Sequence, residues 1–207
     1  MRDRDLVRLY WPVELRPAFD ALFAIDDALG EVVETSTQPA LAAIRLAWWR
    51  EALERLDHGP PPPEPRLQAV VAELLPRPVS GAELGSLADG WAALIEEERD
   101  AERLAARGVA LFAIGAKLLG ADDPLLERAG RLFALSDAAR RELAPTQLGN
   151  AARDGLAGHR FARKLRPLTA LARLAARDAR QWPTLEPQAT PGRAAALLAH
   201  RLFGTVA

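Results

Sequence analysis

The chain has 207 residues, 49% of them hydrophobic, and a formal net charge of −1 at pH 7. This length and composition fit one globular domain with a sizeable core, and the balanced charge excludes a general basic field for nucleic acid. Cysteine is absent, which excludes disulfides, thiolate catalysis and cysteine-ligated zinc. The histidines, which do not have the spacing of metal ligands, are His58, His159 and His200.

The apolar residues are mainly alanine and leucine, which favour helix over strand. We therefore expect an all-α protein, a single domain over residues 1–207 with about eight helices around one core. The N-terminal segment lacks an apolar run of signal-peptide length, and no segment has the roughly 18 consecutive apolar residues of a membrane span. The expected location is cytoplasmic, with at most peripheral membrane contact.

The clearest helical pattern predicts an antiparallel hairpin near the N-terminus. Apolar residues recur every three or four positions from Glu14 to Glu34, which predicts the first helix. Thr37 is the predicted N-cap of a second helix over Pro39–Leu56, and the turn of about four residues makes the two antiparallel. The residues predicted to form the apolar face of the second helix are Leu41, Ile44, Trp48 and Leu53.

Further helices are predicted after a stiff proline-rich spacer at 60–65. Ser80 and Glu83 have the spacing of a capping box, which marks a helix start. Residues 107–120 are apolar nearly all round, so their helix is expected in the middle of the domain. Residues 146–155 have two glycines and no helical period, which predicts a loop. The expected helices cover residues 66–75, 81–99, 101–119, 124–143, 157–182 and 190–203, and the one at 157–182 is expected to break near Pro167.

An acidic stripe follows one side of the first long helix. Asp27, Glu31 and Glu34 lie at helical spacing on one face, with Gly30 between them. Carboxylates in this arrangement suit a hard divalent cation such as Mg²⁺ that also holds a diphosphate. A solvated face of an amphipathic helix has the same pattern, and the pattern alone favours that interpretation.

Four segments follow one another in a characteristic order: LYWPVELRPAFDALFAIDDALGEVVE, IRLAWWREAL, RGVALFAIGAKLLG, and a helix from Gly130 that closes on LAP at 143–145. In this order they resemble the squalene/phytoene synthase family of head-to-head prenyltransferases, over about residues 5–145 and more loosely beyond. The most specific part is Arg16, Phe23-Ala24-Ile25, Glu31 and Glu34, followed by Trp48-Trp49. The resemblance implies the all-α isoprenoid-synthase fold, whose two aspartate-rich helices hold Mg²⁺ and prenyl diphosphate in a central cavity.

The aspartate motifs of that family are altered in this chain. The first motif, Asp-Asp-x-x-Asp, falls on residues 30–34, where Gly30 replaces the leading aspartate and Glu31 and Glu34 replace the others. These two glutamates are the predicted metal ligands. The arginine that usually precedes the motif falls on Asp27, which reverses the charge.

The second metal-binding pair has no counterpart. Asp137 is the only aspartate of the Gly130 helix, and four residues later stands Arg141, whose charge has the wrong sign for a metal site. Loss of one of two opposed carboxylate clusters is expected to abolish the metal clamp that makes diphosphate a leaving group.

The resemblance and the arginine content together suggest further binding residues. Trp48 and Trp49 point in adjacent directions, so at most one enters the core with Ile44, and the other is a candidate interface residue. Arg45 and other arginines (Arg50, Arg131, Arg140 and Arg141) would offer a basic wall to a phosphate, although such arginines more often pair with carboxylates. The predicted ligand-binding residues are Arg16, Phe23, Arg45 and Trp48.

A further basic segment lies near the C-terminus. Arg160, Arg163 and Lys164 precede an apolar face formed by Leu165, Leu168 and Leu171. This pattern fits a membrane surface and a terminal core helix equally well.

The resemblance implies two functions. The first is a non-catalytic family member that needs no cofactor and acts by binding a prenyl lipid or a protein partner. The mitochondrial complex I assembly factor is a precedent, since it resembles these synthases and also departs from their aspartate motifs. The second is an active Mg²⁺-dependent prenyltransferase that condenses prenyl diphosphates in isoprenoid, carotenoid or hopanoid biosynthesis. A plain helical interaction domain is a third interpretation. The altered motifs favour the first.

Overall fold

The computed structural model describes residues 2–96, 100–143 and 153–207, and this part of the chain is helical without any β-strand. The predicted all-α fold is confirmed. The helices are α1 (Asp3–Arg8), a 3₁₀ turn (Val13–Leu15), α2 (Arg16–Thr35), α3 (Pro39–Arg55), α4 (Pro65–Glu73), α5 (Gly81–Gly85), α6 (Leu87–Ala92), α7 (Ala101–Leu119), α8 (Leu126–Arg140), α10 (Arg166–Gln181) and α11 (Pro191–Phe203). None of these helices combines the length and the apolarity required to span a membrane.

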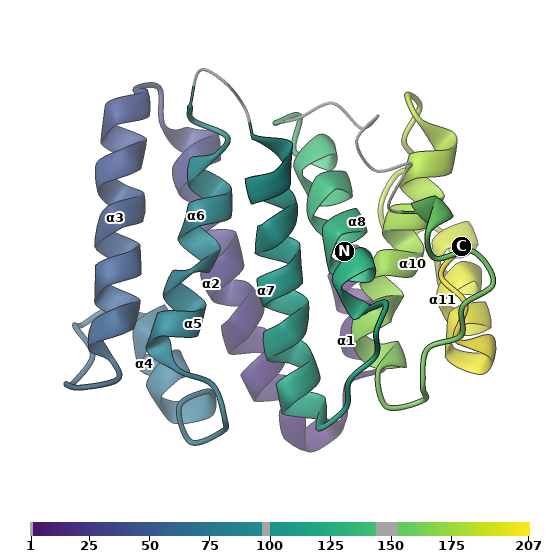
Figure 1. The fold of residues 1–207 in the computed structure, drawn as a ribbon, viewed down its shortest axis with the longest axis horizontal. Helices are drawn as coiled ribbons and strands as arrows, with labels where there is room; N and C mark the ends of the chain where they lie inside the picture. The colour runs from purple at the N-terminus through teal and green to yellow at the C-terminus, as the bar shows by residue number, and fades with distance from the viewer. Residues whose placement is uncertain (1, 97–99, 144–152) are drawn as a thin grey trace.

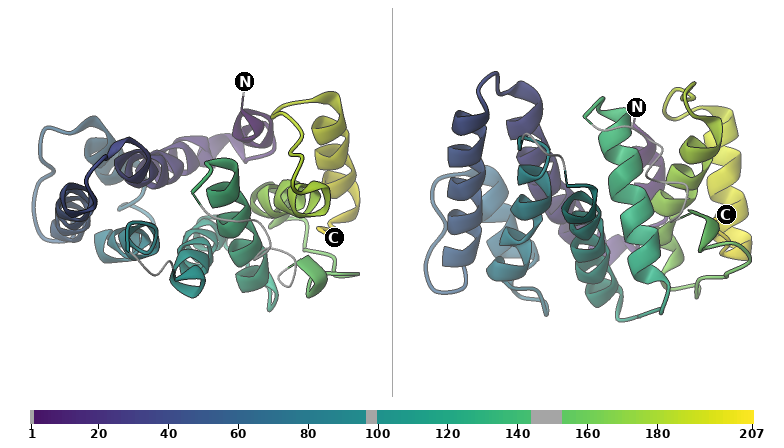
Figure 2. Two further views of the ribbon diagram at one scale, coloured as in Figure 1. Left: turned by 90° about the horizontal axis from the view of Figure 1, so that it is seen from above. Right: turned by 45° about the horizontal axis from the view of Figure 1, so that its top comes forward.

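The helices form two layers. In Figure 1, α3, α6, α7 and α8 stand side by side in front, and α2 runs behind α6 and α7. The view from above in Figure 2 shows the same separation, with α10 and α11 at the end of the molecule opposite α3. Buried leucine, alanine and aromatic side chains fill the space between the layers and form one continuous core. This arrangement brings the C-terminal end of α8 within ion-pair distance of α2, although the two helices are far apart in sequence.

The start of α2 confirms the predicted first helix to within two residues. Pro17 lies in the first turn, where its missing N–H is no loss. Trp11 stacks on Phe19 and Phe23, with ring centroids 4.8 and 5.5 Å apart, and all three rings are buried. Arg16 donates to the backbone carbonyls of residues 9 and 11. It therefore stabilises the N-terminal turn.

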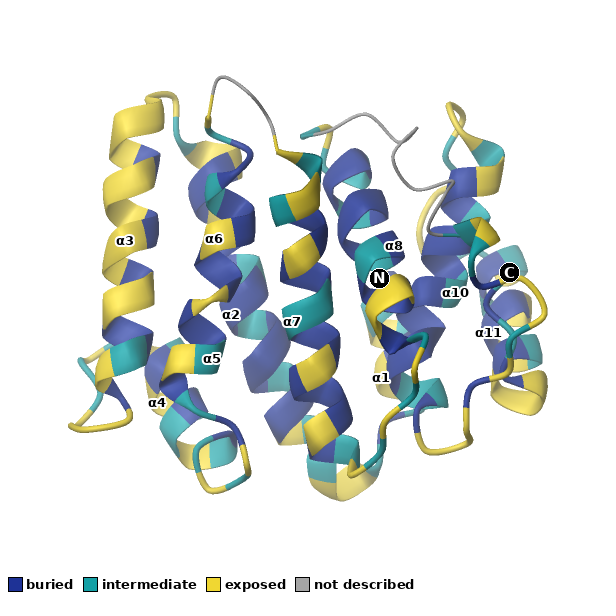
Figure 3. Ribbon diagram, viewed as in Figure 1, coloured by how far each residue is buried: buried dark blue, intermediate teal, exposed yellow. Residues whose placement is uncertain are grey.

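Two expectations for α3 are wrong, although its bounds were predicted well. The N-cap is Gln38 and not Thr37, and no side chain caps the helix. The predicted apolar face is mostly solvent-exposed, because Leu41, Ile44 and Trp48 point away from the core. The residues that α3 buries are Ala42, Leu46, Trp49, Ala52 and Leu53. A second apolar stripe, which contains Leu46, Trp49 and Leu53, thus packs against the core. The outer side of α3 is exposed (Figure 3).

The middle of the chain is more interrupted than predicted. The capping box of Ser80 and Glu83 is present, but α5 ends at Gly85 and α6 follows at once, so residues 81–92 form two short helices. The expected continuation to residue 99 lies partly outside the described residues, since 97–99 are among those left undescribed. The LAP element and most of the predicted loop at 146–155 also lie outside them. Of the predicted helix at 157–182, the regular part starts at Arg166, with Pro167 in its first turn, so the helix boundary lies where the break near Pro167 is predicted.

Two glycines allow α7 and α8 to lie in direct backbone contact. A Cβ atom added to Gly108 would lie 2.0 Å from the carbonyl oxygen of Gly130, and one added to Gly130 would lie 2.4 Å from that of Gly108. No side chain fits at either position without moving a helix. This close approach fixes α8 beside α7, in the position from which its last turn reaches α2.

The C-terminal segment folds back on the start of α10. Gly204 ends α11 with a φ of +77°, and its carbonyl accepts a hydrogen bond from the amide of Phe161. His200 is buried, and its Nδ1 lies 2.8 Å from the carbonyl oxygen of Thr205, which can only accept, so Nδ1 carries the proton. Its Nε2 lies 3.0 Å from the hydroxyl of Thr169. Burial lowers the pKa of His200 to about 4, and the nearby Arg173 adds to this effect.

The buried His200 predicts a pH dependence of stability. The unfolded chain binds a proton on this residue below about pH 6.5, but the folded chain does so only below about 4, so stability falls as the pH falls through this window. We expect about 2 kcal/mol to be lost between pH 7 and 5 from this residue. Urea unfolding at both pH values measures it, with His200→Asn as the control that lacks this contribution. Equal losses in both proteins would contradict the prediction.

Candidate functional site

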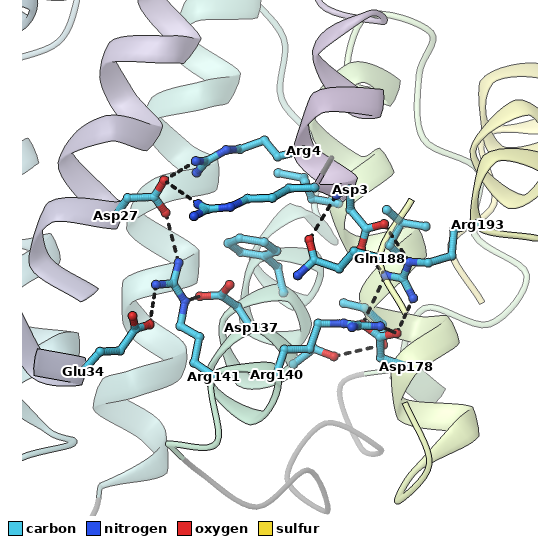
Figure 4. A pocket seen from close by; sticks show the side chains of 16 residues that line it. Asp3, Arg4, Asp27, Glu34, Asp137, Arg140, Arg141, Asp178, Gln188 and Arg193 are labelled. Atoms are coloured by element: carbon cyan, nitrogen blue, oxygen red, sulfur yellow. Dashed lines mark hydrogen bonds and ion pairs between the residues drawn. The ribbon is translucent and has the colours of Figure 1, made fainter. Parts of the chain in front are cut away.

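Charged side chains from α2, α7 and α8 meet between these helices and form an arginine–carboxylate network. We use this name for the carboxylates of Asp26, Asp27, Glu34 and Asp137 with the guanidinium groups of Arg107 and Arg141. Figure 4 shows its outer half, where Arg141 lies among Asp27, Glu34 and Asp137.

At the inner half of the network, Arg107 and Asp26 are buried. Arg107 extends from α7, and its Nη1 lies 3.2 Å from Asp26 on α2, while its Nη2 lies 2.9 Å from Asp137 on α8. The indole N–H of Trp91 donates to Asp26 over 3.0 Å, and the guanidinium of Arg107 lies 4.0 Å from the Trp91 ring centroid. Burial raises the pKa of Asp26, and Arg107 opposes this effect. A buried charge of this kind is tolerated only when it is paired and hydrogen-bonded.

The outer half of the network is organised by Arg141 at the end of α8. Its Nη1 lies 2.7 Å from Glu34, its Nη2 3.0 Å from Asp27, and its Nε 3.2 Å from Asp137. Burial lowers the pKa of Arg141, but the carboxylates of Asp137 and Glu34 outweigh this and raise it above its ordinary value. Burial likewise acts to raise the pKa of Asp137, and Arg107 and Arg141 reverse that to lower it. One guanidinium therefore neutralises carboxylates from both helices.

Gly30 provides the space that this arrangement requires. A Cβ atom at this position would lie 2.8 Å from Nη1 of Arg141 and 2.9 Å from the indole ring of Trp91. A side chain at position 30 would displace one of them. The resemblance assigns the leading aspartate of the first motif to position 30. The space that its side chain would need is filled by Arg141 and Trp91.

A cavity of about 300 Å³ lies beside the network, between α1, α2, α8 and α10 (Figure 4). We call it the α2–α8 cavity. Its charged lining is balanced, because five arginines face five carboxylates: Arg2, Arg4, Arg140, Arg141 and Arg193, with Asp3, Asp27, Glu34, Asp137 and Asp178. Its apolar wall is formed by Phe133, Leu171, Leu174 and Ala175.

A second group of ion pairs closes the far side of this cavity. Arg193 is buried on α11, and its Nε donates to Asp3 over 2.8 Å, while its Nη1 pairs with Asp178 on α10. Arg140 also pairs with Asp178 and donates to a backbone carbonyl at residue 186. The guanidinium groups of Arg140 and Arg193 are thus already paired with carboxylates of the protein.

The predicted site residues lie in three separate places. Glu34 lines the α2–α8 cavity, but Glu31 is exposed beside it and pairs with Arg66 of α4 over 2.9 Å. Phe23 is buried below the guanidinium of Arg4. Arg16 belongs to the N-terminal turn, as described above. Arg45 and Trp48 lie on the exposed side of α3, the helix at the far end of the molecule.

The predicted Mg²⁺ ligands therefore do not converge. Glu31 and Glu34 each have an arginine partner, and among the described residues no group of three carboxylate or histidine side chains is arranged to hold a metal ion. The use of these glutamates as ligands stays a prediction.

The sequence analysis does not predict the inner half of the network, although the sequence contains an indication of it. Arg107 is the only charge between Ala105 and Lys117, in a helix expected at the centre of the domain, and such a charge requires a buried partner. Asp26 precedes Asp27, and because neighbouring helix positions are about 100° apart it lies beside the acidic stripe, on the buried side of α2. A pair between Arg107 and Asp26 is therefore predictable from the sequence.

The described chain is thus an all-α protein with an internally neutralised site between two helices. No protein-family model matches the chain, and neither a curated protein nor a solved structure matches it.

Proposed function

We propose that the chain is a non-catalytic member of the squalene/phytoene synthase family that acts by binding a protein partner. The observation that carries this proposal is the position of Arg141. It lies between α2 and α8, the helices to which the resemblance assigns the two metal motifs, and its guanidinium pairs with Asp27, Glu34 and Asp137. A divalent cation would have to displace this covalently attached charge before it could bind these carboxylates.

The outer face of α3 supports binding to a protein. This face consists of Leu41, Ile44, Arg45 and Trp48, and its apolar members are 49%, 67% and 46% exposed. Figure 3 shows the outer side of α3 exposed along most of its length. A large aromatic side chain among aliphatic neighbours on an open surface is typical of interface anchors. The α2–α8 cavity, in contrast, is at the small end of the range for ligand pockets and is crossed by ion pairs.

Pyrophosphate release tests the absence of catalysis. The protein is incubated with Mg²⁺ and either farnesyl or geranylgeranyl diphosphate, and we expect no release above that of heat-denatured protein. Release that is lost in a Glu31→Ala, Glu34→Ala double variant would establish the active prenyltransferase instead and overturn the proposal.

Site-specific cross-linking tests the partner. A photoreactive phenylalanine analogue replaces Trp48, and the control carries it at Glu102, which is 79% exposed on α7. We expect one discrete cross-linked protein from position 48, none from position 102, and loss of the product when Ile44→Asp is added. Equal products from both positions, or none, would overturn binding through α3. Thermal stabilisation by farnesol without any cross-link would instead identify a prenyl-lipid protein.

A further inference from the structure

A second cavity, of about 320 Å³, lies where α10 begins and α11 ends. This α10–α11 cavity is at the opposite end of the molecule from α3 (Figure 1). Three arginines line it, Arg163, Arg166 and Arg201, and no carboxylate does. Its apolar lining consists of Tyr10, Pro167, Ala170, Leu197 and Leu202. The contrast with the balanced α2–α8 cavity is clear in a chain whose formal net charge is only −1.

The cations of this cavity are held in place without being neutralised. Arg166 donates from Nε to the carbonyl of Phe161 over 3.1 Å and from Nη1 to that of Arg201 over 2.9 Å. The guanidinium of Arg201 lies over the ring of Tyr10, 5.1 Å from its centroid. Arg163 lines the cavity and is exposed to solvent. Within the described part of the chain, none of the three arginines forms an ion pair, so their charges remain available to an anion.

Exposed apolar and basic side chains lie next to the lining residues along the chain, and we call them the rim of the cavity. Leu198 and Leu202 lie one turn apart on α11, and they are 53% and 62% exposed, while the adjacent Phe203 is 58% exposed. Arg160 and Lys164 are exposed on the segment that pairs with the C-terminus. A surface that combines large exposed apolar groups with unpaired cations has the composition of a membrane-surface site.

We propose that the α10–α11 cavity and its rim bind the phosphate headgroup of an anionic phospholipid at a bilayer surface. The three arginines supply the positive charge for one phosphate, and the apolar floor accepts the glycerol backbone and the first carbons of an acyl chain. The rim residues Leu202 and Phe203 enter the boundary between headgroups and acyl chains.

The rim distinguishes a lipid from a soluble phosphate. Inorganic phosphate would use the three arginines but leave Leu198, Leu202 and Phe203 in water, whereas a bilayer covers all of them. The site is independent of the proposed partner surface, because α3 lies at the other end of the molecule and stays accessible when the α10–α11 end contacts a membrane.

Vesicle flotation tests this site. The probes are vesicles of phosphatidylcholine alone and of phosphatidylcholine with phosphatidylglycerol. Arg163→Glu is compared with Arg55→Glu, which makes the same charge change at an exposed position of α3. We expect the wild type and Arg55→Glu to bind the anionic vesicles within twofold of each other, and Arg163→Glu to bind at least tenfold more weakly. A Leu202→Ser, Phe203→Ser variant is expected to lose at least fivefold.

The remaining outcomes overturn the proposal in distinct ways. Equal weakening by both charge reversals would indicate non-specific attraction, and equal binding to both vesicle types would remove the role of the arginines. A rise in melting temperature with inorganic phosphate, without flotation, would assign the cavity to a soluble phosphate. Circular dichroism of each variant checks that it is folded. Cross-linking from position 48 is a separate readout, so failure of one proposal does not imply failure of the other.

Discussion

Replacing Arg107 with methionine is expected to lower the free energy of unfolding by about 3–5 kcal/mol, the largest effect of any single substitution considered for this chain. The side chain of Arg107 has no exposed surface, and that of its partner Asp26 is 2% exposed. Methionine fills a similar volume, so packing is largely kept while the charge is removed. The carboxylate of Asp26 then stays buried with only the indole of Trp91 as donor. Its desolvation is no longer compensated.

A double variant separates charge from packing. Asp26→Asn removes the unpaired charge and keeps an oxygen that accepts from Trp91, so Arg107→Met with Asp26→Asn is expected to recover most of the lost stability. Urea unfolding of the wild type, both single variants and the double variant gives the interaction energy of the pair. A loss of less than about 1 kcal/mol for Arg107→Met would contradict a buried arginine that is paired with Asp26 and Asp137.

Gly108→Ala is expected to destabilise the protein by about 3 kcal/mol, at the upper end of ordinary overpacking effects. The new methyl group would meet the backbone of Gly130, which cannot rotate away, so α7 and α8 must separate. This outcome is opposite to the usual gain when alanine replaces glycine inside a helix. Separation would also move Asp137 and Arg141 away from α2.

Gly59→Ala is the matched control for this substitution. The nearest atom to a Cβ at position 59 lies 3.8 Å away, so its effect should stay within about 0.5 kcal/mol. Thermal unfolding measures both variants, and near-ultraviolet circular dichroism, to which Trp91 contributes, reports changes in the packing of the aromatic side chains. If Gly108→Ala were as stable as the wild type, the two helices would not lie in backbone contact.

Helix positions could be predicted well where apolar spacing and proline agree. The first long helix was expected at 14–34 and lies at Arg16–Thr35, since both its period and Pro17 are local signals. The buried face of α3 could not be predicted in this way. Leu41, Ile44 and Trp48 form one apolar stripe, but a second stripe that includes Leu46 has the same spacing, and only packing against α5 and α6 selects between them.

The candidate site was only partly predictable, because its partners are distant in sequence. The sequence predicts the acidic stripe, and it shows that Arg141 has the wrong charge for a metal site. Its pairing with Glu34 spans 107 positions, and no local pattern reports such a contact. Glu31 was assigned to the same cluster because it shares the stripe, but Arg66 of α4 attracts it to the surface instead.

The guanidinium of Arg141 differs from a bound metal ion in one lasting respect. A bound metal ion dissociates, exchanges with solvent and can be removed by a chelator, whereas an arginine side chain is a tethered counterion that stays protonated at any physiological pH. The contact between α2 and α8 is therefore independent of ionic supply, and chelators should leave its stability unchanged. Two helices that a metal would join only on loading are joined here as soon as the chain folds.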